Sequence, residues 1–317
     1  MRRGLTWFMV WLALFSMSSA SIGCSKGTNS DAQADPSTND QATPGSETES
    51  TESYVPVEVE SNWYAVTYVE PKTYVIREPQ SSQGNVSYLI LGDKRAVMFD
   101  TGSGENAPVD GSKMTHIINQ ITDLPVTLLL SHFHFDHNQN LGEFDNVAFI
   151  ELQHLVDGTS AEGVYTFSQD EILEGNYPKS VQVDEWWSEN TDIDLGGRNI
   201  QVVSIPGHTD ESAMIVDHGN KLMFMGDYLY NGELFVFGEQ NLSVYEQTLD
   251  GLIANYDSSY SMYGAHGYPV VPHTDLQDLK ALLQCISSGE CAPEKTTHWG
   301  WDLHIFYLNG MTICLFL

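Results

Sequence analysis

Basic residues are scarce in this sequence. Its 317 residues include 13 Lys and Arg against 43 Asp and Glu, a formal net charge of −30. Most of the acidic excess lies beyond residue 60, in the part of the chain with enough apolar residues to fold. Such a surface repels polyanions and offers few cations to phosphate groups, so we expect no nucleic-acid partner. A solvated acidic coat, as in salt-tolerant proteins, is the simplest account of the charge.

Cysteines are also few, and none stands in a CxxC pair. The four are Cys24, Cys285, Cys291 and Cys314. Without paired CxxC motifs, the usual cysteine ligand pattern for a structural zinc is absent. In an oxidising compartment Cys285 and Cys291 can close a small loop, which leaves Cys314 as a strand residue near the end; two free thiols are the alternative.

The apolar run that starts near Leu5 and ends near Met17 is too short to favour a membrane span. It follows Arg2 and Arg3 and precedes small residues, so residues 1–24 match a signal peptide. Ser21-Ile22-Gly23-Cys24 resembles a bacterial lipobox, which implies an exported chain anchored only by lipid on Cys24, in the periplasm or at the cell surface. Plain secretion after Ala20 is the alternative.

Residues 25–60 are predicted to be a disordered acidic tether. From Ser25 to about Ser53 the chain has no Leu, Ile, Val or aromatic residue, so this stretch has nothing to bury in a core. Residues 61–317 are then the predicted folded domain, and we expect the function to lie there.

Within this domain, apolar and β-branched runs between turn residues predict strands. They lie at 63–69, 73–76, 86–91, 95–99, 125–130, 198–205, 213–217, 221–225 and 260–263. Apolar residues at helical spacing predict helices at about 112–122, 243–256 and 275–286, and Asn309-Gly310 predicts the turn of a terminal hairpin. Two β-rich halves with helices outside them favour an α+β fold, a four-layer αββα sandwich.

The strongest signal is SHFHFDHNQN at residues 131–140, directly after the apolar run Pro125–Leu130. In an extended loop His132 and His134 point the same way and can bind one ion, while Asp136 and His137 can reach a second. Neutral imidazoles gain little from being neighbours, so a metal is the best explanation of this crowding.

Three further residues follow predicted strands: His208 in PGHTD, Asp227 in MGDYLY and His266 in GAHG. Each alone is more typical of turn chemistry. Together with the histidine motif they complete a metal-binding set.

The series HxHxDH, His, Asp, His resembles the metallo-β-lactamase superfamily over nearly all of residues 61–317, including VMFDTG at 97–102. The resemblance implies a first metal bound by His132, His134 and His208, a second bound by Asp136, His137 and His266, and Asp227 bridging both. The glycine pair usual after the motif is replaced by Asn138-Gln139-Asn140, which leaves the shape of this loop open.

Two divalent ions about 3.5–4 Å apart lower the pKa of a shared water and supply hydroxide, so no protein nucleophile is needed. The nitrogen-rich ligand set suits two Zn²⁺ per chain, with manganese or iron compatible. Asp136 is thereby a predicted catalytic residue. Tyr230 is a second, because similar lactonases place a tyrosine there that donates to the substrate carbonyl; a packed aromatic beside Tyr228 is the alternative.

We therefore predict an exported dinuclear zinc hydrolase for a small-molecule ester, lactone, thioester or related acyl substrate. β-Lactam hydrolysis is an alternative, although true metallo-β-lactamases generally carry Cys or Ser where this chain has Asp227. An iron-dependent oxidoreductase on the same fold and a metal-binding protein without catalysis also stay open. Glutathione thioesters fit poorly, because they are cytosolic and their carboxylates need bases that this chain lacks.

Aromatic residues suggest where an acyl group binds. Phe235 and Phe237, or Trp186 and Trp187, are candidates for the wall of an acyl pocket. Core or interface packing is the alternative for each pair.

Overall fold

The computed structural model describes residues 54–69, 71–105, 113–173, 178–298 and 300–317, all within the compact unit Thr51–Leu317. The predicted signal peptide, including Cys24, and residues 25–53 of the predicted tether lie outside the described residues. Strand β1 (Val55–Val57) pairs antiparallel with β2 (Ala65–Val69). The folded part therefore begins earlier than the predicted boundary at residue 61.

The first sheet contains the histidine motif at the end of one of its parallel strands. Its order is β1, β2, β3 (Thr73–Arg77), β4 (Val86–Leu91), β5 (Ala96–Phe99), β6 (Val126–Leu129), β7 (Val147–Ile150) and β10 (Glu185–Trp187). Strands β1 to β5 are antiparallel, and β5, β6, β7 and β10 are parallel. Helix α1 (Met114–Ile121) lies in the β5–β6 connection and buries Met114, Ile117 and Ile118.

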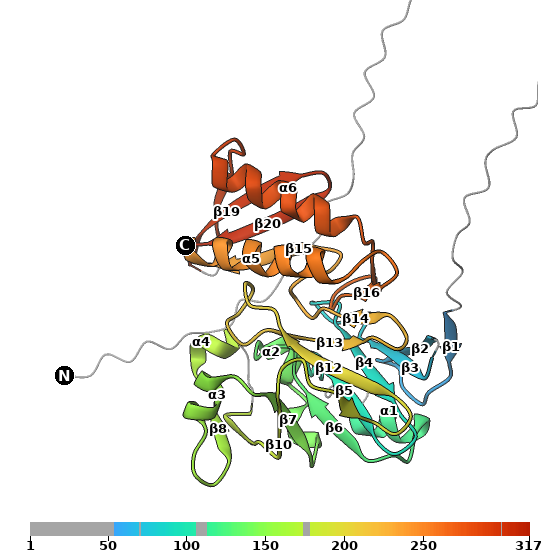
Figure 1. Ribbon diagram of the computed structural model, residues 1–317. Helices are drawn as coiled ribbons and strands as arrows, with labels where there is room; N and C mark the ends of the chain where they lie inside the picture. The colour runs from blue at the N-terminus through green and yellow to red at the C-terminus, as the bar shows by residue number, and fades with distance from the viewer. Residues whose placement is uncertain (1–53, 70, 106–112, 174–177, 299) are drawn as a thin grey trace, which may run out of the picture. The chain divides into compact units, whose positions relative to one another are not determined.

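The second sheet is buried on both faces. Its order is β11 (Ile193–Asp194), β12 (Asn199–Ser204), β13 (Ala213–Asp217), β14 (Leu222–Phe224), β16 (Ser261–Tyr263) and β17 (Val270–Val271). The paired residues Ile215 and Phe224 face the core shared with the first sheet. The next pair, Val216 and Met223, faces a second core under α5 (Gln240–Asn255) and α6 (Asp275–Ser288). Helices thus cover both outer faces of two packed sheets (Figure 1), and the predicted αββα sandwich is confirmed.

A third sheet was not predicted from the sequence. Its order is β15 (Glu233–Phe237), β20 (Met311–Phe316), β19 (Trp301–Leu308) and β18 (Glu294–His298). β15 pairs in parallel with β20, far along the chain, so no local pattern indicates the partnership. The predicted hairpin turn is confirmed, because Asn309 and Gly310 join β19 to β20 with φ values of 52° and 84°. Figure 1 shows α5 and α6 beside this sheet.

The remaining elements are short. They are α2 (Phe135–Asn138), the 3-10 helix η1 (Leu141–Glu143), α3 (Gln153–Gly158), β8 (Val164–Thr166), α4 (Gln169–Ile172) and β9 (Ser180–Gln182). Within the described part of the chain, no helix has both the length and the apolar character to cross a membrane.

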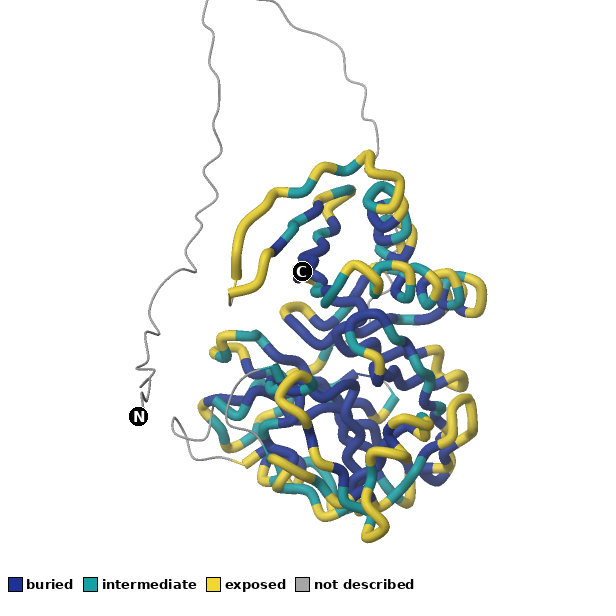
Figure 2. Tube along the Cα trace, turned by 90° about the vertical axis from the view of Figure 1, so that its left-hand side faces the viewer, coloured by how far each residue is buried: buried dark blue, intermediate teal, exposed yellow. Residues whose placement is uncertain are grey.

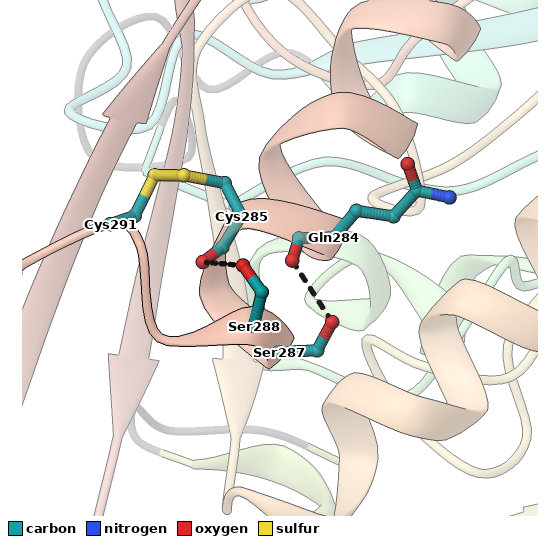
Figure 3. The surroundings of a disulfide bond; sticks show 5 residues. All are labelled: Gln284, Cys285, Ser287, Ser288 and Cys291. Atoms are coloured by element: carbon teal, nitrogen blue, oxygen red, sulfur yellow. Dashed lines mark hydrogen bonds between the residues drawn. A yellow bond between two sulfur atoms is a disulfide. The ribbon is translucent and has the colours of Figure 1, made fainter.

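The structure selects one of the two alternatives left open for the cysteines. Cys285 and Cys291 form a disulfide at the end of α6 (Figure 3). Cys314 is a free, buried residue of β20.

Candidate metal centre

The seven predicted ligands come from loops at one edge of the two packed sheets. His132 and His134 follow β6, and α2 begins at Phe135, so Asp136 and His137 lie in its first turn. His208, Asp227 and His266 follow β12, β14 and β16. These three strands run in the same direction, because β12 and β14 are both antiparallel to β13 and β14 is parallel to β16. Their carboxyl ends therefore meet at the same edge, and all seven side chains come together.

His132, His134 and His208 form the first group. His134 Nδ1 lies 2.9 Å from His132 Nε2 and 3.0 Å from His208 Nε2, and all three side chains are buried. Burial lowers the pKa of each of these imidazoles, well below the ordinary range for His132 and His134. The rings are therefore neutral near pH 7, the state in which imidazole binds a metal.

Asp136, His137 and His266 form the second group, and Asp227 lies between the two groups. Asp136 Oδ2 is 3.5 Å from the Nε2 atoms of both His137 and His266. Asp227 Oδ1 lies 3.2 Å from His137 Nε2 and 2.9 Å from His266 Nε2. Its Oδ2 lies 3.9 Å from His132 Nε2 and 3.7 Å from His208 Nε2. One carboxylate thus reaches both groups.

The electrostatics of the site favour bound cations. Burial opposes protonation of His137, yet Asp227, Asp136 and Asp100 hold its pKa well above the ordinary value. Burial likewise opposes ionisation of Asp227, but His266 and His137 hold its pKa well below its usual range. Among the described residues, His137 Nε2 and Asp227 Oδ1 are buried without a hydrogen-bond partner. Divalent cations satisfy these converging lone pairs, so the residues present fit a pair of metal ions.

Four of the five ligand histidines are oriented through the ring nitrogen that faces away from the site. The contacts, at 2.8–3.0 Å, are Ser131 Oγ for His132, Asp100 Oδ2 for His137, the Phe235 carbonyl for His208 and the Gln83 carbonyl for His266. Such partners fix the tautomer and the ring plane of a metal-binding histidine. The VMFDTG resemblance pointed to Asp100, whereas Gln83 and Phe235 act through backbone carbonyls that no residue pattern reveals.

The asparagines that replace the usual glycines settle the shape of the motif loop. Asn138 Nδ2 donates to the Phe133 carbonyl at 2.6 Å, and Asn140 Nδ2 donates to the Thr101 carbonyl at 2.6 Å. These bonds close the loop on itself and on the turn after β5. The departure from the family pattern therefore leaves the ligands in place.

Two further positioning residues were missed in the sequence. Phe133 N, between the first two ligands, donates to Glu211 Oε1 at 3.1 Å, and burial raises the pKa of Glu211 to about 7. Asn85 Nδ2 donates to the Asp136 carbonyl at 2.8 Å and to Asp136 Oδ2 at 3.3 Å. Both are ordinary polar residues in sequence, and only their contacts mark them.

Gly226 explains the approach of Asp227 to the motif loop. Its φ is +54°, and a Cβ added there would lie 2.7 Å from the Cβ of Ser131. A residue with a side chain would force β14 away from the loop that begins at Ser131.

The predicted aromatic residues divide between the site and the core. Tyr230 is buried with its ring 4.8 Å from that of His266, and its hydroxyl donates to the Glu233 carbonyl. The Phe237 ring lies 5.5 Å from His134 and 5.8 Å from His208. The Trp186–Trp187 pair packs on the first core instead, with Trp187 buried there.

Comparisons with known proteins agree with this geometry. Residues 83–285 match the family described as the Metallo-beta-lactamase superfamily. The acyl-coenzyme A thioesterase MBLAC2 of Homo sapiens is 27% identical over 191 residues, which cover 54% of this chain and 68% of that protein. The hydroxyacylglutathione hydrolase GloC of Haemophilus influenzae is 26% identical over 165 residues, which cover 47% of this chain and 68% of that protein.

Solved structures share the fold. A metallo-β-lactamase from Pontibacter korlensis aligns with a TM-score of 0.51 and 18% identity, covering 70% of this chain and 99% of that one. The metallo-β-lactamase IND-7 aligns with a TM-score of 0.52 and 14% identity, covering 72% and 100%. The family match spans most of the chain and includes all seven ligands in their expected order. This chain belongs to the metallo-β-lactamase superfamily.

Proposed function

We propose that this protein is a dinuclear zinc hydrolase that cleaves acyl thioesters or esters. The position of Asp227 carries the proposal, because its two oxygens face the first and the second group of ligands at once. A carboxylate placed between the two groups would hold an ion on either side, and Asp227 stands where true metallo-β-lactamases generally carry Cys or Ser. The site therefore favours acyl-ester chemistry over β-lactam hydrolysis.

The residues of the site have separate tasks in this proposal. When bound, the two ions supply Lewis acidity and an activated water. Asp100, Ser131 and the Phe235 and Gln83 carbonyls hold the ligand rings in one orientation. Asn85 holds the Asp136 carboxylate toward the second group. Tyr230 reaches a substrate carbonyl only after its hydroxyl leaves the Glu233 carbonyl, so its role as a donor stays a prediction.

The similar proteins support a thioester or ester as the substrate. Two of them are named for thioester hydrolysis, one on acyl-coenzyme A and one on hydroxyacylglutathione. This chain has a net charge of −30, which disfavours leaving groups that carry phosphates or several carboxylates. We therefore propose a substrate whose thiol or alcohol portion has little negative charge.

We also propose that the protein is exported. Arg2, Arg3 and the apolar run behind them support a signal peptide, and Ser21-Ile22-Gly23-Cys24 supports lipid attachment at Cys24. Mass spectrometry of the mature N-terminus tests this proposal. A lipid-modified Cys24 is the expected result, and a mature chain that begins at Ser21 or retains Met1 contradicts the lipid anchor.

Metal analysis followed by a substrate panel tests the hydrolase. We expect two zinc ions per chain and turnover of an aryl ester or a simple thioester, with nitrocefin cleaved poorly. Asp136→Ala should lower kcat by at least a hundredfold, because the second ion loses a ligand, while exposed Asp257→Asn serves as the control. Bound iron with visible absorbance and no turnover would support the oxidoreductase instead. Efficient nitrocefin cleavage would support a β-lactamase.

A further inference from the structure

The third sheet, in which β15 and β20 pair in parallel and the other strands antiparallel, carries apolar side chains on both faces, which is unusual for a sheet with one side free for solvent. Phe306 and Ile313 point to the core under α5 and α6. Their neighbours Ile305 and Cys314 pair with each other and point to the opposite face, because side chains alternate along a strand. The helices cover only the first of these faces.

The opposite face, which we call the second face, forms continuous rows across three strands. Leu303 pairs with Phe316 and Phe316 with Phe237, while Ile305 pairs with Cys314 and Cys314 with Phe235. By alternation, Trp301 and Tyr307 extend the rows along β19. Within the four strands this face carries no lysine or arginine, since Lys295 pairs with His304 on the helix side. Its carboxylates stand on the two edge strands: Glu294 of β18 pairs with Ile305, and Glu233 of β15 pairs with Thr312.

The second face begins at the first group of metal ligands. The Phe237 ring lies 5.5 Å from His134, and the Phe235 carbonyl accepts the bond from His208 Nδ1. Phe316 stacks on Phe237 with ring centroids 5.0 Å apart. The apolar surface is therefore continuous from the reacting centre into the sheet.

Its other end is exposed. Trp301 is 56% and Tyr307 55% exposed, while Phe235, Phe237 and Ile305 are partly buried. Figure 2 shows the β18–β19 hairpin as the mostly exposed hairpin at the upper left of that view. Large aromatic side chains in water are costly unless something apolar covers them.

We propose that the second face holds the acyl chain of the substrate, with the acyl carbon at the metal centre and the alkyl chain directed along Phe237, Phe316 and Ile305 toward Tyr307. The inference rests on the proposed hydrolase function and narrows its substrate to fatty acyl thioesters or esters. An uncharged alkyl chain matches the face, because its centre is apolar, it has no lysine or arginine to bind an anion, and its carboxylates stand only on the two edge strands. Continuity with the ligand histidines selects the acyl part of the substrate as the occupant.

A chain-length series of p-nitrophenyl esters, from acetyl to decanoyl, tests the proposal in the metal-loaded protein. We expect kcat/KM to rise by about fourfold for each added methylene, the factor that corresponds to ~0.8 kcal/mol of buried CH₂, until the face is filled. Ile305→Ser and Tyr307→Ser should each reduce the decanoyl-to-acetyl ratio by tenfold or more. Val156→Ser, an exposed apolar position on α3 outside the third sheet, should keep the wild-type ratio.

Calorimetric binding of 1-decanol separates this inference from the hydrolase function. The wild type should bind 1-decanol with a negative heat-capacity change, and Ile305→Ser and Tyr307→Ser should weaken the binding. If the protein binds 1-decanol in this way but hydrolyses no ester, the hydrolase function is wrong and the second face is still an alkyl-binding surface. If kcat/KM is equal for acetyl and decanoyl esters, or if both variants keep the wild-type decanoyl-to-acetyl ratio, the second face does not bind the acyl chain. The hydrolase function is unaffected by that result. Tyr307 is largely exposed, so its variant folds even if Ile305→Ser does not.

Discussion

Glu78 shows how a single buried side chain supports the metal site from outside it. Its Oε2 accepts from Ser103 N at 2.8 Å and its Oε1 accepts from Trp63 Nε1 at 3.0 Å. Gly102, the residue before Ser103, has a φ of +72°, and a Cβ added to it would lie 2.4 Å from Glu78 Oε2, so the carboxylate packs where a side chain would otherwise stand. These contacts hold the turn that follows Asp100, the residue whose carboxylate orients His137.

The same carboxyl predicts a pH dependence of stability. Burial raises the pKa of Glu78 from 4.5 to about 7, so the folded state binds its proton more tightly than the unfolded state. The resulting stabilisation is complete below about pH 4.5 and is lost as the pH rises through 7. Between pH 5 and 8 the ionisation of Glu78 therefore lowers the free energy of unfolding of the wild type by on the order of 2 kcal/mol. The glutamine in Glu78→Gln cannot ionise, so the free energy of unfolding of this variant should fall less over the same pH range, by that amount.

Urea unfolding at pH 5, 6, 7 and 8 measures this difference. The comparison uses the slope of the unfolding free energy against pH, because Glu78→Gln also alters a hydrogen bond at every pH. Exposed Asp257→Asn is the control and should follow the wild type. Parallel slopes for wild type and Glu78→Gln would show that Glu78 is already ionised in the fold at pH 5.

The ends of the strands and helices position the metal ligands and the disulfide. Strands β12, β14 and β16 end at the same sheet edge and deliver His208, Asp227 and His266 to one place. Helix α6 ends at Ser288. Its C-cap residue Gly289 has a φ of +75° and donates to the Ile286 carbonyl, and the chain then turns back to the disulfide. Helix α6 contacts β19 and β20, so it supports the sheet proposed to bind the acyl chain.

Loss of the disulfide should therefore destabilise the protein measurably. Cys285 and Cys291 are six positions apart, and closing so short a loop in the unfolded chain corresponds to about 2 kcal/mol. Changing both cysteines to Ser should lower the free energy of unfolding by that amount. Denaturant unfolding with and without reductant measures it, with the double variant as the control that reductant leaves unchanged. Equal stability of the oxidised wild type and the double variant would refute the prediction.

For the whole molecule, the metal centre is the place where distant parts of the chain are joined. Its ligands follow strands of both packed sheets, and two of their partners are backbone carbonyls from the β3–β4 connection and from β15 of the third sheet. The unfolded chain does not bring these ligands together. Metal binding therefore favours the folded state over the unfolded one.

We expect zinc to raise the melting temperature and a chelator to lower it. At a free zinc concentration 100 times Kd, the stabilisation is about 2.7 kcal/mol. In Asp227→Ala the shift should be smaller, because the bridging carboxylate is absent, whereas Asp257→Asn should match the wild type. Calorimetry at two zinc concentrations measures these shifts. A melting temperature independent of zinc would contradict metal binding at this site.

Much of the fold and most of the metal centre could be read from local sequence. Alternating and helical apolar spacing located most strands of the two packed sheets and the helices α1, α5 and α6. The histidine motif, His208, Asp227 and His266 were recognisable because metal ligands need particular side chains in a particular order. The disulfide was one of two readings, and the structure selected it.

The tertiary structure decided what depends on contacts between distant segments. β15 was missed because its partner, β20, lies far along the chain, and pairing of that kind leaves no periodic signal near either strand. The Phe235 and Gln83 carbonyls are backbone atoms that every residue type carries, so only their positions beside His208 and His266 give them a role. The second face exists only once three strands are placed in register. The sequence by itself determined which residues can bind metal. The fold decided how these residues are oriented and which apolar surface lies beside them, because orientation and surface arise from packing rather than from residue type.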